Sequence, residues 1–299
     1  MDELRFDERV AIVTGGGRGL GRAHALLLGA RGAQVVVNDD GGSVNGDGTS
    51  NEPAEAVAEE IRAAGGIAIA DNTSVATPEG GRSIVAHAID EFGRLDIVVA
   101  NAGILRDKAF HNMTSEMFDH VMDVHLRGSF HVLQPAFVHM RERGYGRVVT
   151  TSSSAGLYGN FGQVNYSTAK MGLVGMARTI ATEGARFNIK ANAVAPNAFT
   201  RMTENLITGS AAERLKPDLV SPVVAWLCHE DCPVTGQVFQ VGSGRVARVF
   251  VAETTGYWNE ALTPEDVAAN FDTMMDESGY SVPASVADAG KLMAAPFKN

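Results

Sequence analysis

A glycine-rich turn between a buried strand and a helix restricts the fold of this chain more than any other feature. Residues 10–13 form a short apolar run typical of a buried strand, and the turn TGGGRGLG follows at residues 14–21. An Ala- and Leu-rich stretch then predicts a helix that ends near residue 30. Glycines at such a turn permit positive φ and a close approach of the backbone, and the helix amino terminus then faces a pyrophosphate. This order of elements predicts a nucleotide site in an α/β fold.

The glycine spacing is T-G-x-x-x-G-x-G rather than the G-x-G-x-x-G dinucleotide fingerprint. Arg18 and Leu20 occupy positions where that fingerprint would have glycine. Because the physical demand on the backbone is similar, we expect Gly15, Arg18, Gly19, Leu20 and Gly21 to contact the cofactor. The alternative is a glycine-rich turn that binds no ligand.

A carboxylate after the second expected strand, residues 33–38, favours NAD over NADP. Asp39 ends this strand, where a carboxylate can accept hydrogen bonds from the adenosine ribose and repel a 2′-phosphate. Arg18 favours the opposite choice, since a cation in the glycine turn could bind that phosphate. We give Asp39 more weight, because an unpaired carboxylate against a phosphate costs more than an idle arginine. The alternative for Asp39 is a solvated turn residue.

Alternating strand and helix patterns continue after a Gly-, Asn- and Asp-rich surface loop at residues 40–51. Strands are expected at residues 67–70, 95–99, from 148, 189–195 and 237–241, and helices at 53–64, 78–92, 115–126, 129–143, 166–187 and 217–227. The pattern predicts a Rossmann-type, doubly wound parallel sheet in one domain over residues 1–244. Residues 245–299 form a C-terminal extension, expected to pack on the same domain or on a partner subunit.

The stretch from residue 148 to residue 170 carries the candidate catalytic side chains. It begins as a β-branched run, passes through a glycine-spaced turn and becomes helical near Tyr166. Ser153 would then lie at the end of a strand, while Tyr166 and Lys170 share one helix face. Such a trio suits proton transfer at an alcohol oxygen: the serine polarises the oxygen, the tyrosine carries the proton and the lysine cation favours the phenolate. A Tyr-x-x-x-Lys pair alone is a weak signal, so its value depends on the other motifs.

Composition and the chain's amino terminus narrow the function classes. A net charge of −10 argues against binding to nucleic acid or to an anionic membrane. The start, MDELRFDERV, lacks a secretion signal and no apolar run reaches membrane-spanning length, so we expect a soluble intracellular protein, cytoplasmic in a bacterium. Cys228 and Cys232 flank His229, but a metal site needs more ligands than this segment offers. We expect free thiols and no metal.

Together these motifs resemble the short-chain dehydrogenase/reductase family over residues 5–244. The family's order is reproduced by TGGGRGLG, ANAG at residues 100–103, Ser153 and YSTAK from Tyr166. The resemblance implies a seven-stranded sheet and hydride transfer to or from a nicotinamide, with Lys170 also holding the nicotinamide ribose. Further cofactor contacts are expected at strand ends, from Ser74, Val75, Asn101, Ala102, Gly103, Pro196, Ala198 and Thr200.

Two positions depart from the family pattern. The family's fourth catalytic residue is an asparagine in V-N-x-x-G that holds a proton-relaying water, and His125 stands in its place. His125 could serve a relay or pack against the helix bend. Thr73 or Ser74 stands near the site of an adenine-contacting aspartate, and Asp71 could substitute for it.

Further segments resemble the branch of this family that oxidises (3R)-hydroxyacyl-CoAs, among them NDDGGSVNGDG, NAGILRDKAF, VHLRGSFHV and APNAFTRMTENL. The resemblance implies NAD-dependent oxidation of a (3R)-hydroxyacyl-CoA, fatty or steroidal, to the ketone. The alternatives are a 17β-hydroxysteroid dehydrogenase, an NADPH-dependent 3-ketoacyl reductase and, more remotely, a non-catalytic nucleotide-binding scaffold.

The substrate and the assembly suggest further contacts. The phosphates of CoA would need a basic patch, for which Arg106, Lys108 and Arg201 are candidates. Family members usually pair through two long helices, here residues 129–143 and 166–187, so we expect a homodimer. Met171, Val174 and Met176 would contribute to that interface or to the core of the subunit.

Overall fold

Buried apolar runs assemble into one eight-stranded sheet in this computed structural model, which describes residues 3–200 and 214–294 of the chain. The strand order is β3-β2-β1-β4-β5-β6-β7-β8, and β1 to β7 pair in parallel. The strands are β1 Val10–Thr14, β2 Gln34–Asn38, β3 Ile67–Asp71, β4 Ile97–Ala100, β5 Gly146–Thr151, β6 Ile189–Pro196, β7 Val238–Gly242 and β8 Arg245–Val249. Every residue of β1, β4 and β5 is buried, as expected for a parallel sheet that is covered on both faces.

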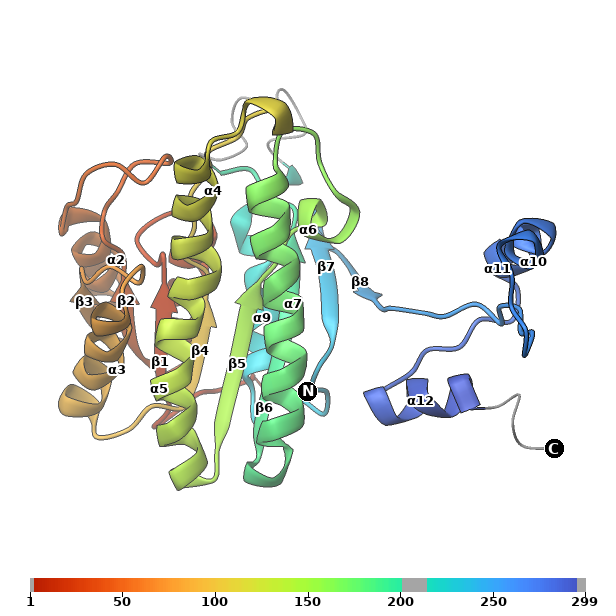
Figure 1. Cartoon of the computed structure of the whole chain (residues 1–299). Helices are drawn as coiled ribbons and strands as arrows, with labels where there is room; N and C mark the ends of the chain where they lie inside the picture. The colour runs from red at the N-terminus through yellow and green to blue at the C-terminus, as the bar shows by residue number, and fades with distance from the viewer. Residues whose placement is uncertain (1–2, 201–213, 295–299) are drawn as a thin grey trace. The chain divides into compact units, whose positions relative to one another are not determined.

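Helices cover both faces of the sheet. They are α1 Gly19–Ala30, α2 Glu52–Ala63, α3 Pro78–Phe92, α4 Ser115–Met122, α5 Gly128–Arg143, α6 Ser154–Tyr158, α7 Val164–Gly184 and α9 Ser221–Cys228. Figure 1 shows α3, α5 and α7 in front of the sheet and α9 behind it. Two hydrophobic cores result, one containing Leu28, Ile61 and Val224 and the other containing Ile84 and Leu133. This architecture is the Rossmann-type fold that the sequence predicted.

Three details of the sequence prediction were wrong. The sheet has eight strands rather than seven, because β8 in the expected extension adds to the edge beside β7. The helical path does not break between residues 126 and 129: a π-helical turn, Asp123–Arg127, joins α4 to α5. Gly128 is helical there, and a Cβ on it would lie 2.8 Å from Val75 Cγ2, so this glycine serves close packing rather than helix termination. The short helix α6 was not anticipated.

The chain divides into two compact units, Met1–Arg248 and Val249–Asn299. Within the second unit, α10 (Pro264–Ala269) begins with a capping box formed by Thr263 and Asp266. It is followed by α11 (Phe271–Met275) and α12 (Val286–Ala294). In the part of the chain that the structure describes, none of the helices combines the length and the apolar character needed to cross a bilayer.

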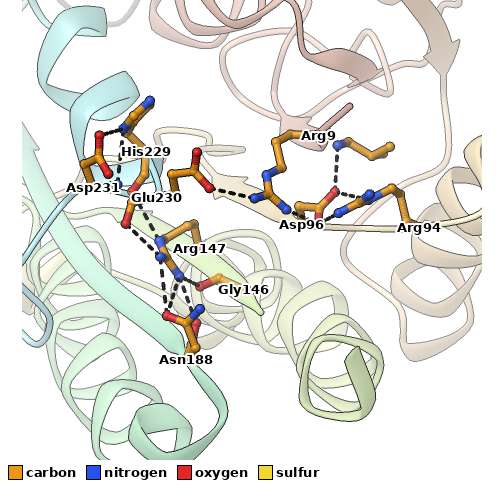
Figure 2. A network of polar contacts seen from close by, with 10 residues as sticks. Arg9, Arg94, Asp96, Gly146, Arg147, Asn188, His229, Glu230 and Asp231 are labelled. Carbon is orange, nitrogen blue, oxygen red and sulfur yellow. Dashed lines mark hydrogen bonds and ion pairs between the residues drawn. The ribbon is translucent and has the colours of Figure 1, made fainter. Parts of the chain in front are cut away.

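A buried arginine organises the amino ends of the central strands (Figure 2). Arg147 in β5 is only 1% exposed, and its guanidinium donates to the carbonyl oxygens of Gly146 at 2.8 Å, Asn188 at 2.8 Å and Glu230 at 3.1 Å. Burial lowers the pKa of this guanidinium. Because these carbonyls belong to separate segments, Arg147 fixes the end of the sheet that lies opposite the glycine turn.

Candidate active site

One cavity of about 640 Å³ lies at the carboxyl ends of the strands. Parallel strands present these ends at a single edge of the sheet, which is where doubly wound folds bind ligands. The cavity is lined by all the predicted catalytic residues and by all the predicted cofactor contacts except Gly21: Gly15, Arg18, Gly19, Leu20, Asp39, Ser74, Val75, Asn101, Ala102, Gly103, His125, Ser153, Tyr166, Lys170, Pro196, Ala198 and Thr200. A Cβ on Gly21 would lie 2.0 Å from the Gly15 carbonyl oxygen, so this glycine allows α1 to pack closely under the turn.

The glycine turn is locked against the turn that follows β4. Thr14 Oγ1 accepts hydrogen bonds from the backbone N–H groups of Asn101 at 3.0 Å and Ala102 at 3.1 Å. Asn101 Nδ2 donates in return to the carbonyl oxygens of Thr14 at 3.1 Å and Gly15 at 3.2 Å. Gly15 has a φ of 62°, and a Cβ on it would lie 2.8 Å from Ala102 Cα. Two motifs far apart in the sequence therefore form one rigid wall.

Asp39 is fixed beside this turn. Its Oδ2 accepts from the Gly17 N–H at 2.9 Å and its Oδ1 from the Gly41 N–H at 2.9 Å. Arg18 Nη1 donates to the Gly42 carbonyl oxygen at 3.3 Å. The carboxylate is thus held at the edge of the glycine turn, while the arginine is directed to the loop that follows β2.

Asp71 does not line the cavity. Its Oδ1 accepts from Asn38 Nδ2 at 3.0 Å and from the Thr73 N–H at 2.9 Å, and its Oδ2 lies 2.7 Å from His87 Nδ1. These internal partners occupy both carboxylate oxygens. Asp71 is therefore placed to shape the segment after β3, and the cavity is lined there by Thr73, Ser74 and Val75.

The three candidate catalytic side chains converge. Ser153 precedes α6, where its Oγ accepts from the Ala155 N–H at 3.2 Å, and its side chain lies close enough to the Tyr166 phenol to lower the pKa of that phenol. Lys170 lies one turn beyond Tyr166 on α7, with Nζ 5.5 Å from the centre of the tyrosine ring. The same Nζ donates to the Thr151 carbonyl oxygen at 2.6 Å. A hydroxyl, a phenol and an amine thus share one wall of the cavity.

Burial governs the protonation of this trio. It raises the pKa of the Tyr166 phenol, the hydrogen bond from Ser153 lowers it, and the negative charge of Asp107 raises it further. Burial also lowers the pKa of Lys170 to about 7. The sequence analysis assigned Lys170 a full positive charge that favours the phenolate. Burial reduces this charge near neutral pH in the ligand-free protein, and the role of Lys170 stays a prediction.

His125 is buried in the π-helical turn against Tyr166. Its Nε2 lies 2.7 Å from the carbonyl oxygen and 3.0 Å from the backbone N of Ile104, and its ring meets the Tyr166 ring edge-on at 5.2 Å. Burial and the nearby Lys170 lower the histidine pKa well below its usual value, so the ring is neutral. Its Nδ1 has no hydrogen-bond partner among the residues described. Gly103 leaves room for the ring, since a Cβ there would lie 2.2 Å from His125 Cε1.

The loop at residues 40–51 contributes to the cavity, which the sequence analysis missed when it assigned a plain surface loop. Gly42, Ser43, Val44 and Gly46 line the cavity. The Leu105 N–H donates to the Val44 carbonyl oxygen at 2.9 Å, and Arg106 binds the Asn45 carbonyl oxygen and the Asp47 carboxylate, each at 3.0 Å. Arg106 is therefore engaged by this loop rather than free for a phosphate, and Arg201 lies outside the described residues. In the sequence, the unusual length of this loop was the feature that could have indicated its contribution to the cavity.

Cys228 and Cys232 are buried free thiols, and burial raises the pKa of Cys228. Within residues 3–200 and 214–294, no group of three His, Cys, Asp or Glu side chains is arranged to hold a metal ion.

Comparison with known proteins finds a family match and similar proteins in several organisms. Residues 9–211 match the sequence profile described as short chain dehydrogenase. The chain is 49% identical over 276 residues to a short-chain type dehydrogenase/reductase of Mycobacterium tuberculosis, covering 92% of this chain and 96% of that protein. It is 47% identical over 290 residues to peroxisomal multifunctional enzyme type 2 of Mus musculus, covering 96% of this chain but only 39% of that protein.

A solved structure agrees with these relatives. Full-length peroxisomal multifunctional enzyme type 2 from Drosophila melanogaster matches with a TM-score of 0.84 and 38% identity, covering 99% of this chain. The match covers 50% of the Drosophila chain, so this protein spans about half of that enzyme's length.

Proposed function

The chain belongs to the short-chain dehydrogenase family, and we propose that within this family it oxidises the hydroxyl group of a (3R)-hydroxyacyl-CoA with NAD⁺. Membership confirms the resemblance drawn from the motifs and makes the chain an oxidoreductase that acts on CH–OH groups with a nicotinamide cofactor. The observation that carries the proposal is the convergence of Ser153, Tyr166 and Lys170 on a cavity that also contains the glycine turn. The segments shared with the (3R)-hydroxyacyl-CoA branch support the substrate.

The residues present fit a dinucleotide. Gly15 and Gly19 carry no side chain, so a pyrophosphate could approach the amino terminus of α1. The unpaired backbone N–H groups at that terminus favour an anion. Asp39 lies at the edge of this turn, where a carboxylate suits two ribose hydroxyls and repels a 2′-phosphate, which supports NAD over NADP. When bound, the oxidised nicotinamide supplies a hydride acceptor and a positive charge. Lys170 is the residue that would hold its ribose.

The chain's own groups would then handle the proton. Ser153 hydrogen-bonds the substrate oxygen, and Tyr166 takes its proton as the general base. Because burial raises the pKa of Tyr166, the phenol is protonated in the ligand-free protein at neutral pH and must first release this proton. Lys170, with a pKa of about 7, can exchange a proton near neutrality beside it. We assign His125 the positioning of the Tyr166 ring, since the two rings are in edge-on contact.

Two further contacts belong to the proposal. Lys108 is exposed, so it is available to bind a phosphate of CoA, whereas Arg106 is bonded to the loop after β2.

Exposed apolar side chains on α5 and α7 would form a homodimer interface: Phe130 is 54% exposed and Met171 is 42% exposed. Val174 is 2% exposed and belongs to the core of the subunit instead.

The test is the formation of reduced cofactor from NAD⁺ or NADP⁺ with a panel of (3R)- and (3S)-hydroxyacyl-CoAs and hydroxysteroids. We expect the highest kcat/KM with NAD⁺ and the (3R)-hydroxyacyl-CoAs. A preference for NADP(H) would instead identify a 3-ketoacyl reductase, and a preference for free hydroxysteroids would identify a hydroxysteroid dehydrogenase. If no substrate of the panel were turned over, the remaining alternative would be a non-catalytic protein that binds a nucleotide.

A further inference from the structure

The loop that follows β2 crosses the carboxyl end of β1, where the glycine turn lies. Its middle is bonded to the loop after β4, and in the sheet β1 lies between β2 and β4. Arg18 in the glycine turn donates to the Gly42 carbonyl oxygen on the way across. In Figure 1 this loop extends over the upper edge of the sheet toward α4. We call residues 40–50 the strap.

The strap has a defined shape and forms part of the cavity wall. The Ser50 N–H donates to the Asp40 carbonyl oxygen at 2.9 Å, so the two ends of the strap meet. Gly46 has a φ of 83°, and a Cβ on it would lie 2.6 Å from His120 Nε2, so the middle of the strap is seated closely on α4. Its residues that line the cavity are Asp40, Gly42, Ser43, Val44 and Gly46.

Arg106 fastens the middle of the strap to the loop after β4. Its Nε donates to the Asn45 carbonyl oxygen and its Nη2 to Asp47 Oδ1, each at 3.0 Å. The guanidinium therefore contacts the strap through a carbonyl group and a carboxylate, which are charge-assisted hydrogen bonds. The side chain of Arg106 is only 30% exposed, so solvent screens these bonds incompletely.

The backbone of Arg106 stands on a rigid base beside the candidate catalytic tyrosine. Its carbonyl oxygen accepts from Asn165 Nδ2 at 2.9 Å, and the same Nδ2 donates to the Met117 carbonyl oxygen at 3.2 Å. Asn165 Oδ1 accepts from the Tyr166 N–H at 2.8 Å, and Asn165 is 0% exposed. Replacing the Arg106 side chain leaves all these bonds in place. The guanidinium can therefore be tested apart from the start of α7.

We propose that Arg106 is a positioning residue that latches the strap across the cofactor site and thereby retains the bound dinucleotide. The assignment rests on the proposed function only for a dinucleotide held at the glycine turn, and not for the identity of the acyl substrate. While the latch is closed, cofactor binding does not carry the entropic cost of ordering the strap. Without the guanidinium, the strap opens more often and the cofactor leaves faster.

The test compares Arg106→Met with the wild type for binding of NADH and NADPH by calorimetry and for NADH release by stopped-flow fluorescence. Methionine keeps the apolar stem and removes both donors, so the NADH dissociation constant and release rate should rise about tenfold. The KM for NAD⁺ should rise similarly, while kcat at saturating cofactor should not fall more than about twofold.

Arg62→Met in α2 is the matched control. The Arg62 guanidinium also contacts a carbonyl group and a carboxylate, the Ala68 oxygen at 3.1 Å and Glu59 at 2.7 Å, and its side chain is 37% exposed. Arg62 does not line the cavity. This variant should bind NADH within about twofold of the wild type.

Asp47→Asn tests the latch from its other side, at a side chain that is 70% exposed and does not support the fold. It should weaken NADH binding about threefold. Adding Arg106→Met to Asp47→Asn should cost less affinity than Arg106→Met alone, because the two residues share one bond.

Several outcomes would overturn the assignment. Unchanged NADH affinity and release in Arg106→Met would show that the strap is not latched by this residue. A loss of affinity for the acyl-CoA alone would place Arg106 in a phosphate-binding patch, and an equal loss in Arg62→Met would indicate general destabilisation. A wild type that binds neither NADH nor NADPH would refute the proposed function as well. Weaker NADH binding in the variants would support the latch even if no hydroxyacyl-CoA were turned over.

Discussion

Replacement of Lys170 by methionine should remove a pH-dependent cost from the stability of the ligand-free protein. Lys170 is 3% exposed, and its amine donates to the Thr151 carbonyl oxygen at 2.6 Å. Burial lowers its pKa from 10.5 to about 7. Methionine has similar length and no charge, so the variant keeps the packing while abolishing the titration. The lost bond to Thr151 is a constant penalty that does not depend on pH.

The size of the effect follows from proton linkage. Between pH 7 and pH 10.5 the unfolded chain binds a proton at Lys170 that the folded protein releases, so stability rises with pH in this window. The slope is about 1.4 kcal/mol per pH unit, and below pH 7 both states are protonated and the slope vanishes. Allowing for partial protonation at pH 7, the free energy of unfolding of the wild type relative to Lys170→Met should rise by about 2 kcal/mol from pH 7 to pH 9.

The assay is urea unfolding of both proteins at pH 7, 8 and 9, with free energies from linear extrapolation. Lys108→Met, which changes an exposed lysine, is the matched control and should follow the wild type at every pH. The difference in free energy of unfolding between the wild type and Lys170→Met is the quantity to follow. If this difference changed by less than about 0.5 kcal/mol from pH 7 to pH 9, the buried lysine would not be desolvated and the argument would fail.

Three further changes test other parts of the structure. Arg147→Met should lower the free energy of unfolding by about 3 kcal/mol, because several buried carbonyl groups lose their charged donor; a loss below about 1 kcal/mol in urea unfolding would refute this role. Gly21→Ala should weaken NAD binding at least about tenfold in calorimetry, because its Cβ would meet the Gly15 carbonyl oxygen at 2.0 Å. Gly290→Ala in α12, where no atom lies within 4 Å, is its control and should bind NAD normally. Asp39→Ser should raise the NADP⁺ to NAD⁺ ratio of kcat/KM at least about tenfold, and an unchanged ratio would show that Asp39 does not select the cofactor.

The fold and most of the residues that line the cavity could be predicted from the sequence, because the parallel topology of the sheet determines both. Gly15, Asn101 and Ser153 follow the buried strands β1, β4 and β5, which are neighbours in the sheet, so the sheet itself brings them to one edge. The spacing of Tyr166 and Lys170 is equally local, since residues four apart share a helix face. No tertiary information was needed for these assignments.

Other features depend on contacts that no local pattern encodes. The contacts of Val44 with Leu105 and of Asp47 with Arg106 join the loop after β2 to the loop after β4, which are far apart in the sequence. The sequence analysis therefore assigned the loop after β2 to the surface alone. The π-helical turn at His125 is followed by Gly128, which packs so closely on Val75 that a Cβ would not fit, and neither feature has a local sequence pattern. The protonation of Tyr166 and Lys170 depends on how deeply they are buried, which the order of residues does not state.

The central claim is that Tyr166 removes the proton of the substrate alcohol. It is tested most directly by comparing wild type and Tyr166→Phe for NADH formation from a (3R)-hydroxyacyl-CoA, with NAD⁺ binding to each measured by calorimetry. We predict that the variant loses turnover by at least about a hundredfold, the contribution of a positioned base, while its affinity for NAD⁺ stays within about twofold. Turnover close to that of the wild type in a variant that binds NAD⁺ normally would contradict the account.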